Sequence, residues 1–270
     1  MFTKLLAYEI RSRYRTDARS IGAFIVTIAV ASGIVAAGLP GISGSTAVLA
    51  YALCAFTPVA CAIAGLSDYW KTLYGQRGYF TMSLPVSGKV IFWAKNTRIM
   101  IECLLALALA VGGIIAVASS AAWSDGISLL EYTSGPRSLA AGMPTSTVVI
   151  MIVVQVILSM SWVVQGCAVM SIGAEGRFNH MGFGAPIIGF VLVYIVNQVL
   201  STVGTFFLPL SVTTDGHFST EIMWTSYRAT MGTDGQPNVI GIGSYILVPL
   251  FALFLGLWAS RSIEKHTSLR

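Results

Sequence analysis

Six long apolar runs constrain the fold of this chain more than any other feature. Each is about the 20 residues that a helix needs to cross a hydrocarbon core of roughly 30 Å. The runs occupy residues 21–39, 46–66, 99–122, 147–173, 182–208 and 241–260. Because they lack the alternating polar pattern of barrel strands, the sequence predicts an all-α polytopic membrane protein with six transmembrane helices.

Basic residues are divided unevenly between the two sides that these spans define. Of the 16 Lys and Arg residues, only Arg137 and Arg228 fall on one side. The others are Lys4, Arg11, Arg13, Arg15, Arg19, Lys71, Arg77, Lys89, Lys95, Arg98, Arg177, Arg261, Lys265 and Arg270. Since short loops rich in Lys and Arg stay in the cytoplasm, both termini are expected there. Anionic lipid attracts basic groups so placed, which implies a lipid partner and no nucleic acid.

Residues 1–20 carry a second, weaker pattern. Phe2, Leu5, Leu6, Ile10 and Tyr14 recur at helical spacing, with basic residues on the other faces. The pattern predicts an N-terminal amphipathic helix in the cytoplasmic interface. A solvated basic arm is the alternative.

The longest cytoplasmic connection covers residues 67–98 and interleaves aromatic with basic residues, as segments at the membrane boundary do. Gly75 and Gly78 permit a sharp turn, and Pro85 ends any helix arriving from Tyr79. We expect a short helix, a turn and a second interfacial helix. The external segment 209–240 is either an exposed loop or a re-entrant one. No internal repeat is evident, so residues 1–270 are expected to form one domain.

Enzymatic motifs are weak. The sequence has no G-x-x-x-x-G-K-[ST] phosphate loop, so we expect no ATPase activity in this chain. The stretch Gly41-Ile42-Ser43-Gly44 matches the G-x-S-G pattern of intramembrane serine proteases, but every histidine falls outside the spans, so Ser43 has no expected base. No His or carboxylate stands at metal-ligand spacing from the cysteines, which are expected to be reduced packing residues without a metal. The cysteines are Cys54, Cys61, Cys103 and Cys167.

Polar residues inside the spans are the candidates for function. Glu102 is the one ionisable residue placed in a span, and Arg98 four residues earlier is its expected ion-pair partner. Uncharged polar and aromatic side chains either line a substrate path or bond one helix to another. These candidates are Gln155, Ser159, Trp162, Tyr194, Asn197, Gln198 and Ser201.

One stretch of the cytoplasmic connection resembles a known family. It reads Leu73-Tyr74-Gly75-Gln76-Arg77-Gly78-Tyr79-Phe80-Thr81-Met82-Ser83-Leu84-Pro85-Val86-Ser87, and Lys95 follows it. It is similar to the L-[FY]-G-x-x-G-Y-x-x-x-x-L-P-V-S pattern of permease subunits of type-2 ABC transporters from Gram-positive bacteria. The opening Leu5-Leu6-Ala7-Tyr8-Glu9-Ile10-Arg11 also resembles that family. Relatives often have an acidic residue where this chain has Arg77, so no ion pair with an ATPase is carried over to that position.

The resemblance implies an exporter subunit in the plasma membrane of a bacterium, driven by a separate ATPase. That ATPase would hold the ATP and magnesium, and a second permease, identical or similar, would complete the transporter. The residues implied to couple to the ATPase are Tyr74, Gly75, Gln76, Arg77, Gly78, Tyr79, Leu84, Pro85 and Val86. Apolar spans with scattered amides suit an amphipathic or hydrophobic substrate, such as an antimicrobial peptide, a drug or a lipid-like compound. The alternative is an ATP-independent immunity or scaffold protein that sequesters a peptide, which the scarcity of polar residues in the spans favours.

Overall fold

Six long helices dominate the computed structural model, which describes residues 1–75, 78–83, 85–232 and 235–265. They are α1 (Phe2–Ala36), α2 (Ser43–Leu73), α4 (Gly88–Ser124), α7 (Thr145–Gly173), α8 (Gly184–Phe207) and α10 (Ser244–Lys265). All six are long and apolar enough to cross a membrane. The prediction of an all-α polytopic membrane protein is therefore confirmed.

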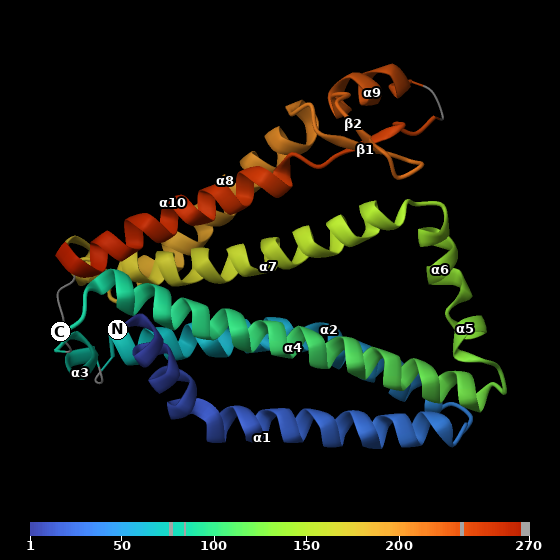
Figure 1. The fold of residues 1–270 in the computed structure, drawn as a ribbon, viewed down its shortest axis with the longest axis horizontal. Coiled ribbons are helices and arrows are strands. Elements are labelled where there is room, and N and C mark those ends of the chain that lie inside the picture. Colours follow the sequence, from blue (N-terminus) through green and yellow to red (C-terminus); the bar gives the residue numbers. More distant parts are fainter. Residues whose placement is uncertain (76–77, 84, 233–234, 266–270) are drawn as a thin grey trace. The chain divides into compact units, whose positions relative to one another are not determined.

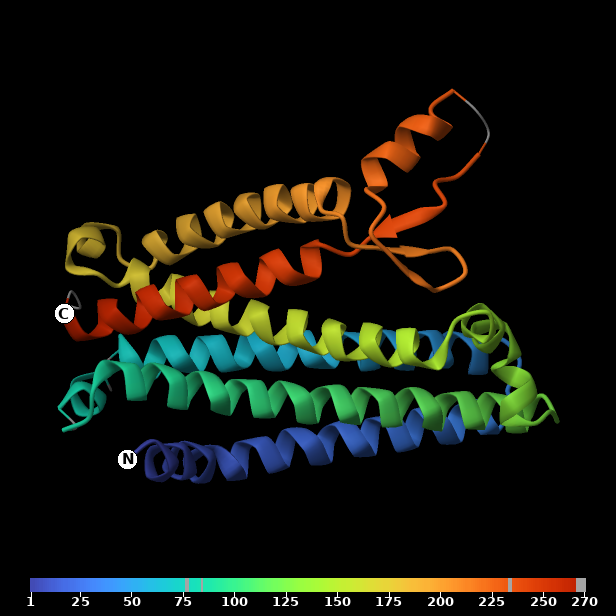
Figure 2. The same ribbon diagram turned by 45° about the horizontal axis from the view of Figure 1, so that its top comes forward.

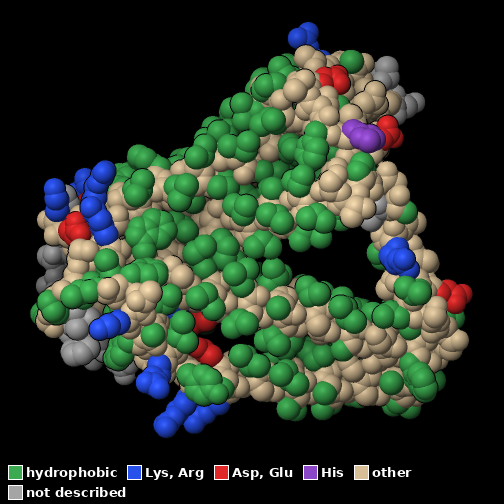
Figure 3. Space-filling view, in the orientation of Figure 1, with side chains coloured by type: hydrophobic (Ala, Val, Ile, Leu, Met, Phe, Trp, Pro, Cys, Tyr) green, Lys and Arg blue, Asp and Glu red, His purple; other side chains and the backbone are tan. Residues whose placement is uncertain are grey.

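The outer surfaces of these helices are strongly apolar. Val48 and Leu49 on α2 are 67% and 70% exposed, and Val26 on α1 is 63% exposed. Figure 3 shows hydrophobic side chains along the middle of the helices on the face drawn, with Lys and Arg nearer the helix ends. Continuous apolar cover of this extent is typical of surfaces that meet lipid rather than water.

The chain divides into two compact units. Unit 1 comprises Met1–Thr72 and Trp93–Arg137, and unit 2 comprises Leu73–Phe92 and Ser138–Arg270. Unit 1 thus holds α1, all of α2 except its last residue and most of α4, together with the short helix α5 (Leu129–Tyr132) and part of α6 (Ser134–Ala141).

In unit 1, α1, α2 and α4 lie side by side (Figures 1 and 2). A short turn joins α1 to α2, and Gly38 and Gly41 take positive φ angles there that other residues rarely adopt. The core of the three helices is a cluster of small and branched side chains. Its members are Ile28, Ala50, Cys54, Ala110 and Val117.

The N-terminal segment is continuous with the first span. We expected an interfacial helix over residues 1–20 followed by a separate span from 21, but α1 runs unbroken from Phe2 to Ala36. Figure 1 shows its first turns at an angle to the rest. Within this segment Ser12 Oγ donates to the carbonyl of Glu9, a local side-chain bond to the backbone. Ile10 and Tyr14 stay exposed, as an interfacial helix requires.

In unit 2, two glycines of α8 permit close approaches to its neighbours α10 and α7. A Cβ added at Gly204 of α8 would lie 2.5 Å from the backbone nitrogen of Ser244, where α10 begins. A Cβ at Gly189 would lie 2.7 Å from Val169 Cγ1 on α7. Glycine at both positions lets these helices come closer than any side chain would permit.

The segment between α8 and α10 contains strands that the sequence analysis did not anticipate. Strands β1 (Ser211–Thr213), β2 (Phe218–Ser219) and β3 (Val239–Gly241) form an antiparallel sheet in the order β2-β1-β3, with helix α9 (Met223–Thr230) between β2 and β3. Rings of Trp224 and Tyr227 on α9 pack against Phe206 at the end of α8. The described residues between α8 and α10 therefore form a folded strand module rather than a plain loop.

We predict that Gly204→Ala weakens the contact between α8 and α10. The new methyl group would overlap the backbone of Ser244, so the free energy of unfolding should fall by about 1–3 kcal/mol. The midpoint of thermal unfolding of the purified protein in detergent measures this. Gly112→Ala on α4 is the matched control, because a Cβ there meets no atom within 4 Å and replaces glycine inside a helix. Equal midpoints for the two variants would contradict the packing described here.

Candidate functional site

The connection between α2 and α4 is shorter than the sequence predicted. We expected residues 67–98 to lie outside the spans, but α2 continues to Leu73 and α4 begins at Gly88. Hydropathy marks where lipid ends, not where a helix ends, because charged turns can extend a helix beyond the hydrocarbon. Between the two lies the five-residue helix α3 (Gly78–Met82), which ends before Pro85 as expected.

Most of the residues that the family resemblance assigned to ATPase coupling can be placed. Tyr79 on α3 is 59% exposed, and Pro85 is exposed as well. Gly78 is buried, whereas Tyr74, Gly75 and Val86 are half-buried. Gln76, Arg77 and Leu84 lie outside the described residues. The described part of this connection therefore presents an aromatic ring and a proline at its surface.

The end of this connection packs on the last turns of α10. A Cβ added at Gly88 would lie 2.8 Å from Glu264 Cγ and 2.9 Å from Ile263 Cγ2. Both partners belong to unit 2, so the connection and the end of α10 lie at the same end of that unit.

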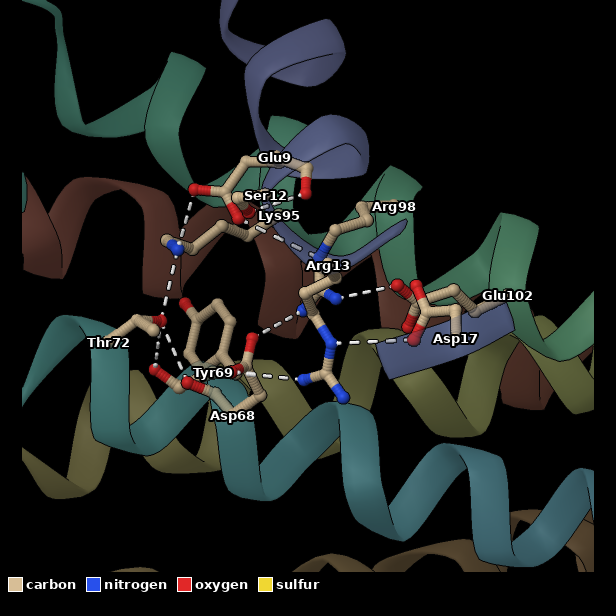
Figure 4. A network of polar contacts seen from close by, with 10 residues as sticks. All are labelled: Glu9, Ser12, Arg13, Asp17, Asp68, Tyr69, Thr72, Lys95, Arg98 and Glu102. Atoms are coloured by element: carbon tan, nitrogen blue, oxygen red, sulfur yellow. Dashed lines mark hydrogen bonds and ion pairs between the residues drawn. The ribbon is translucent and has the colours of Figure 1, made fainter. Parts of the chain in front are cut away.

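A network of charged side chains joins α1, α2 and α4 in unit 1 (Figure 4). Lys95 Nζ of α4 lies 2.8 Å from Glu9 Oε1 of α1 and donates to Thr72 Oγ1 of α2 over 3.0 Å. The side chain of Lys95 is 3% exposed and that of Glu9 10%. This part of the network ties the N-terminal segment to the other two helices.

Arg98 is the centre of the network, and its side chain is fully buried. Its Nη1 lies 2.7 Å from Glu102 Oε1, so these two residues form the ion pair that their spacing predicts. Its Nη2 lies 2.9 Å from Asp68 Oδ2 of α2, and its Nε lies 3.7 Å from Glu9 Oε2. One guanidinium thus contacts carboxylates on three different helices.

Arg13 extends the network toward solvent. Its Nη1 lies 3.0 Å from Asp68 Oδ1, and its Nε lies 3.6 Å from Asp17 Oδ1. Four carboxylates thus face three cations, which leaves an excess of one negative charge in a mostly buried cluster. Buried charges are tolerated only with partners, so the arrangement holds the three helices in one relative position.

Sequence reasoning found only the local pair in this network. Glu9 and Asp68 were not recognised as partners because they are 86 and 30 residues from the basic residues that they bond. The available signal was the position of Asp68 close to the end of an apolar run, where unpaired charge is costly. Glu9 lies well before the first run and carries no such signal.

A second polar contact lies in unit 2, between α7 and α8. Asn197 Nδ2 donates to Gln165 Oε1 over 2.7 Å, and Gln165 Nε2 donates back to Asn197 Oδ1 over 3.3 Å. Gln165 Nε2 also lies 3.4 Å from the carbonyl of Val248 on α10. Both side chains are buried, so this reciprocal amide pair links all three helices of the unit. The sequence alone does not single out Gln165 among the polar residues of the spans.

The predicted substrate-path residues do not share one surface. Asn197 points into the helix packing, whereas Tyr194 and Trp162 are 55% and 50% exposed. Gln198 Nε2 donates to Tyr194 Oη over 2.9 Å, and both residues lie on the outer side of α8. On α7 the remaining pair stays local: Gln155 is exposed, and Ser159 Oγ donates to its carbonyl over 2.9 Å. Ser201 is half-buried.

Two other candidate chemistries find no support. Ser43 is the first residue of α2, and its hydroxyl donates to the carbonyl of Ile34 over 3.2 Å, as a structural turn residue would. Within the part of the chain that the structure describes, no group of three His, Cys, Asp or Glu side chains could hold a metal ion.

The chain matches no protein-family model, no curated protein and no solved structure. Its function must therefore be inferred from its own residues.

We predict that Arg98→Met lowers the free energy of unfolding by about 3–5 kcal/mol. The substitution removes the one cation that contacts Asp68, Glu102 and Glu9 together, and buried carboxylates without a partner are strongly destabilising. Unfolding of the purified protein by sodium dodecyl sulfate measures the change. Lys89→Met is the control on the same helix, since Lys89 is exposed and should contribute within about 0.5 kcal/mol. Equal effects would show that the network does not stabilise the fold.

We predict a strong coupling between Gln165 and Asn197. Asn197→Leu should lower the free energy of unfolding by about 0.5–2 kcal/mol, because it leaves the carboxamide of Gln165 with only the carbonyl of Val248. The double variant Gln165→Leu with Asn197→Leu should cost less than the sum of the single variants. Gln155→Leu, at an exposed amide of α7, is the control. Additive effects would disprove a pairwise bond between the two amides.

Proposed function

We propose that the chain is the permease subunit of an ATP-driven exporter of the type-2 ABC transporter kind. Three features support the proposal: six apolar helices, the family-like motif that contains Gly75 and Gly78, and a sequence without its own phosphate-binding loop. ATP and magnesium then belong to separate ATPase subunits. A second permease, identical or similar to this chain, completes the transporter in a bacterial plasma membrane.

Helix α3 is the observation that carries the proposal. It is a five-residue helix between the ends of two long membrane helices, and it exposes the ring of Tyr79. A rigid element of this kind can pass the movement of an ATPase to the helices on either side, whereas a flexible loop would absorb the movement. Only residues 74–77 separate α3 from α2, and only residues 83–87 separate it from α4.

The charged network holds α1, α2 and α4, the helices that would receive this movement, in fixed positions relative to each other. Arg98 and Lys95 stand two to three turns after the start of α4, and Asp68 stands between one and two turns before the end of α2. Ion pairs among these residues and Glu9 tie the three helices together. The tied positions on α2 and α4 are close to α3 in sequence. A push on α3 would then displace α1, α2 and α4 as a body rather than bending one of them.

Orientation is part of the proposal. The unequal division of Lys and Arg puts both termini and α3 in the cytoplasm, where an ATPase can reach α3. The contact of Gly88 with Glu264 supports this assignment, because it brings the end of the connection and the end of α10 to one side of unit 2. The strand module then lies outside. An apolar or amphipathic cargo suits the few polar groups of the spans.

We predict that Tyr79→Glu prevents assembly with the ATPase. A buried interface tyrosine commonly contributes about 2 kcal/mol or more, so recovery of an ATP-hydrolysing subunit with the affinity-tagged chain should fall roughly 30-fold. Pull-down from membranes of the native host, followed by assay of ATP turnover, measures the loss. Tyr8→Glu is the matched control, because Tyr8 is 57% exposed and lies on α1.

The outcomes separate the two candidate functions. Retained assembly and coupled ATP turnover in Tyr79→Glu would disprove the role of α3. If the unmodified chain recovers no ATPase at all, the exporter proposal fails, and the ATP-independent peptide-sequestering function becomes the better account of the apolar spans.

A further inference from the structure

Two of the four cysteines meet across α2 and α4 inside unit 1. The thiol of Cys103 on α4 donates a hydrogen bond to the sulfur of Cys61 on α2. Both are free thiols, and Cys103 is buried whereas Cys61 is half-buried. Of the other two cysteines, Cys54 lies about two turns away on α2, and Cys167 belongs to unit 2. The chain therefore contains one pair of thiols in direct contact.

The packing of α2 on α4 puts this pair in register. Asp68, near the end of α2, pairs with Arg98, near the start of α4. Earlier on α2, Cys54 meets Gly113 further along α4, where an added Cβ would lie 2.7 Å from the cysteine sulfur. The helices are thus antiparallel, and their stretches between these two contacts lie along each other.

Gly65 brings the two backbones to the separation that a disulfide requires. A Cβ added at Gly65 would lie 3.5 Å from Ile99 Cβ. Cysteines joined by a disulfide have Cβ atoms about 3.5–4.5 Å apart. Cys61 is one turn before Gly65 and Cys103 is one turn after Ile99, so the two thiols meet beside this close approach.

We propose that Cys61 and Cys103 are a redox-active dithiol, which a hydroperoxide converts to an intramolecular disulfide. Both residues lie within apolar runs of the sequence, near the ends of their spans. A hydroperoxide is small and uncharged, so it can enter such a place without the cost of moving a charge out of water. A charged disulfide such as oxidised glutathione would have to meet that cost.

The oxidation has two steps, and its atoms and electrons balance without another reactant. The sulfur of Cys61, the less buried thiol, attacks one oxygen of the hydroperoxide. The O–O bond breaks, an alcohol leaves with the thiol proton, and Cys61 becomes a sulfenic acid. The sulfur of Cys103 then attacks that sulfur, the S–O bond breaks, and water leaves with the second proton. The two thiols have given up two electrons, which the two peroxide oxygens have taken.

A disulfide here would join α2 to α4 beside the charged network. Glu102, which pairs with Arg98, is the residue before Cys103. The bond closes a loop of residues 61–103 that contains α3 and the adjoining ends of both long helices. Once it has formed, α2 and α4 can no longer slide past each other. The dithiol does not depend on the transport function, and a failed recovery of an ATPase leaves it unchanged.

Counting free thiols tests the proposal. The full-length protein in phospholipid vesicles is treated with hydrogen peroxide or cumene hydroperoxide, denatured, and labelled with a polymer maleimide that adds a visible mass for each thiol. The unmodified chain should fall from four labelled thiols to two, and dithiothreitol should restore all four. Cys61→Ala should keep the three thiols that remain to it. Cys54→Ala is the matched control on the same helix, and it should fall from three thiols to one.

Each of three results would overturn the proposal. One is that the unmodified chain keeps four thiols under conditions that fully oxidise free glutathione in the same sample. Another is that Cys61→Ala loses thiols as the unmodified chain does. The third is a loss that dithiothreitol does not reverse, because it would show oxidation to a sulfinic acid instead of a disulfide.

A second experiment tests the geometry and leaves every cysteine in place. In Gly65→Ala the new methyl group would lie 2.7 Å from Ile99 Cγ2, so α2 and α4 must move apart. A misplacement of about 1 Å can slow a reaction of positioned groups about 100-fold, so disulfide formation should slow by about 10-fold or more. Gly112→Ala is the control, because a Cβ there meets no atom within 4 Å. Equal rates in the two variants would show that the close approach does not position the thiols.

The two oxidants distinguish the source of the hydroperoxide. Cumene hydroperoxide partitions into lipid, whereas hydrogen peroxide stays in water. The rate of thiol loss with each oxidant is divided by its rate with glutathione in solution. A larger ratio for cumene hydroperoxide would identify a lipid hydroperoxide as the oxidant, and a larger ratio for hydrogen peroxide a water-borne one. Either result supports the dithiol.

Discussion

Hydrocarbon supplies no hydrogen-bond partner, and the polar groups of this chain are arranged around that constraint. The carboxylates of Glu9, Asp68 and Glu102, from three different helices, meet around Arg98. The amides of Gln165 and Asn197 face each other between helices. Long helices with apolar surfaces can then keep their relative positions even though lipid competes for every apolar contact between them. Polar pairs therefore supply the specificity that a water-soluble core draws from hydrophobic burial.

The spans could be predicted because one physical quantity, the length of an apolar run, decides them. Their ends could not. Asp68 and Lys71 lie in the last turns of α2, and Lys89, Lys95 and Arg98 lie in the first turns of α4. A prediction based on hydropathy stops at such charges, but the backbone continues as a helix, and Asp68, Lys95 and Arg98 find partners on neighbouring helices. The strand module escaped prediction for a different reason: strands of two or three residues are too short to show any alternation, and β1 pairs with β3 across a long stretch of chain.

Within the candidate site, a contact between residues close in sequence could be predicted, whereas contacts between distant residues could not. The Arg98–Glu102 pair follows from a spacing of four residues on a helix. Nothing local distinguishes Gln165, which is buried and paired, from Gln155, which is exposed on the same helix. Choosing between them requires knowledge of which side of α7 meets α8 and α10. One contact that contributes to this arrangement is Gly189 of α8, whose missing side chain admits Val169 of α7.

The distance along the chain between Glu9 and Lys95 has a consequence for biosynthesis. The two residues are 86 positions apart, and a ribosome adds roughly 5–20 residues per second, so Glu9 exists for roughly 4–17 s before its partner is made. During that interval α1 and α2 are synthesised in full, but Lys95 and Arg98 of α4, which neutralise Glu9 and Asp68, are still absent. The first segment to be synthesised is thus among the last to be fixed in place. The ordering of the N-terminus can therefore serve as a sign that the third long helix has been inserted correctly.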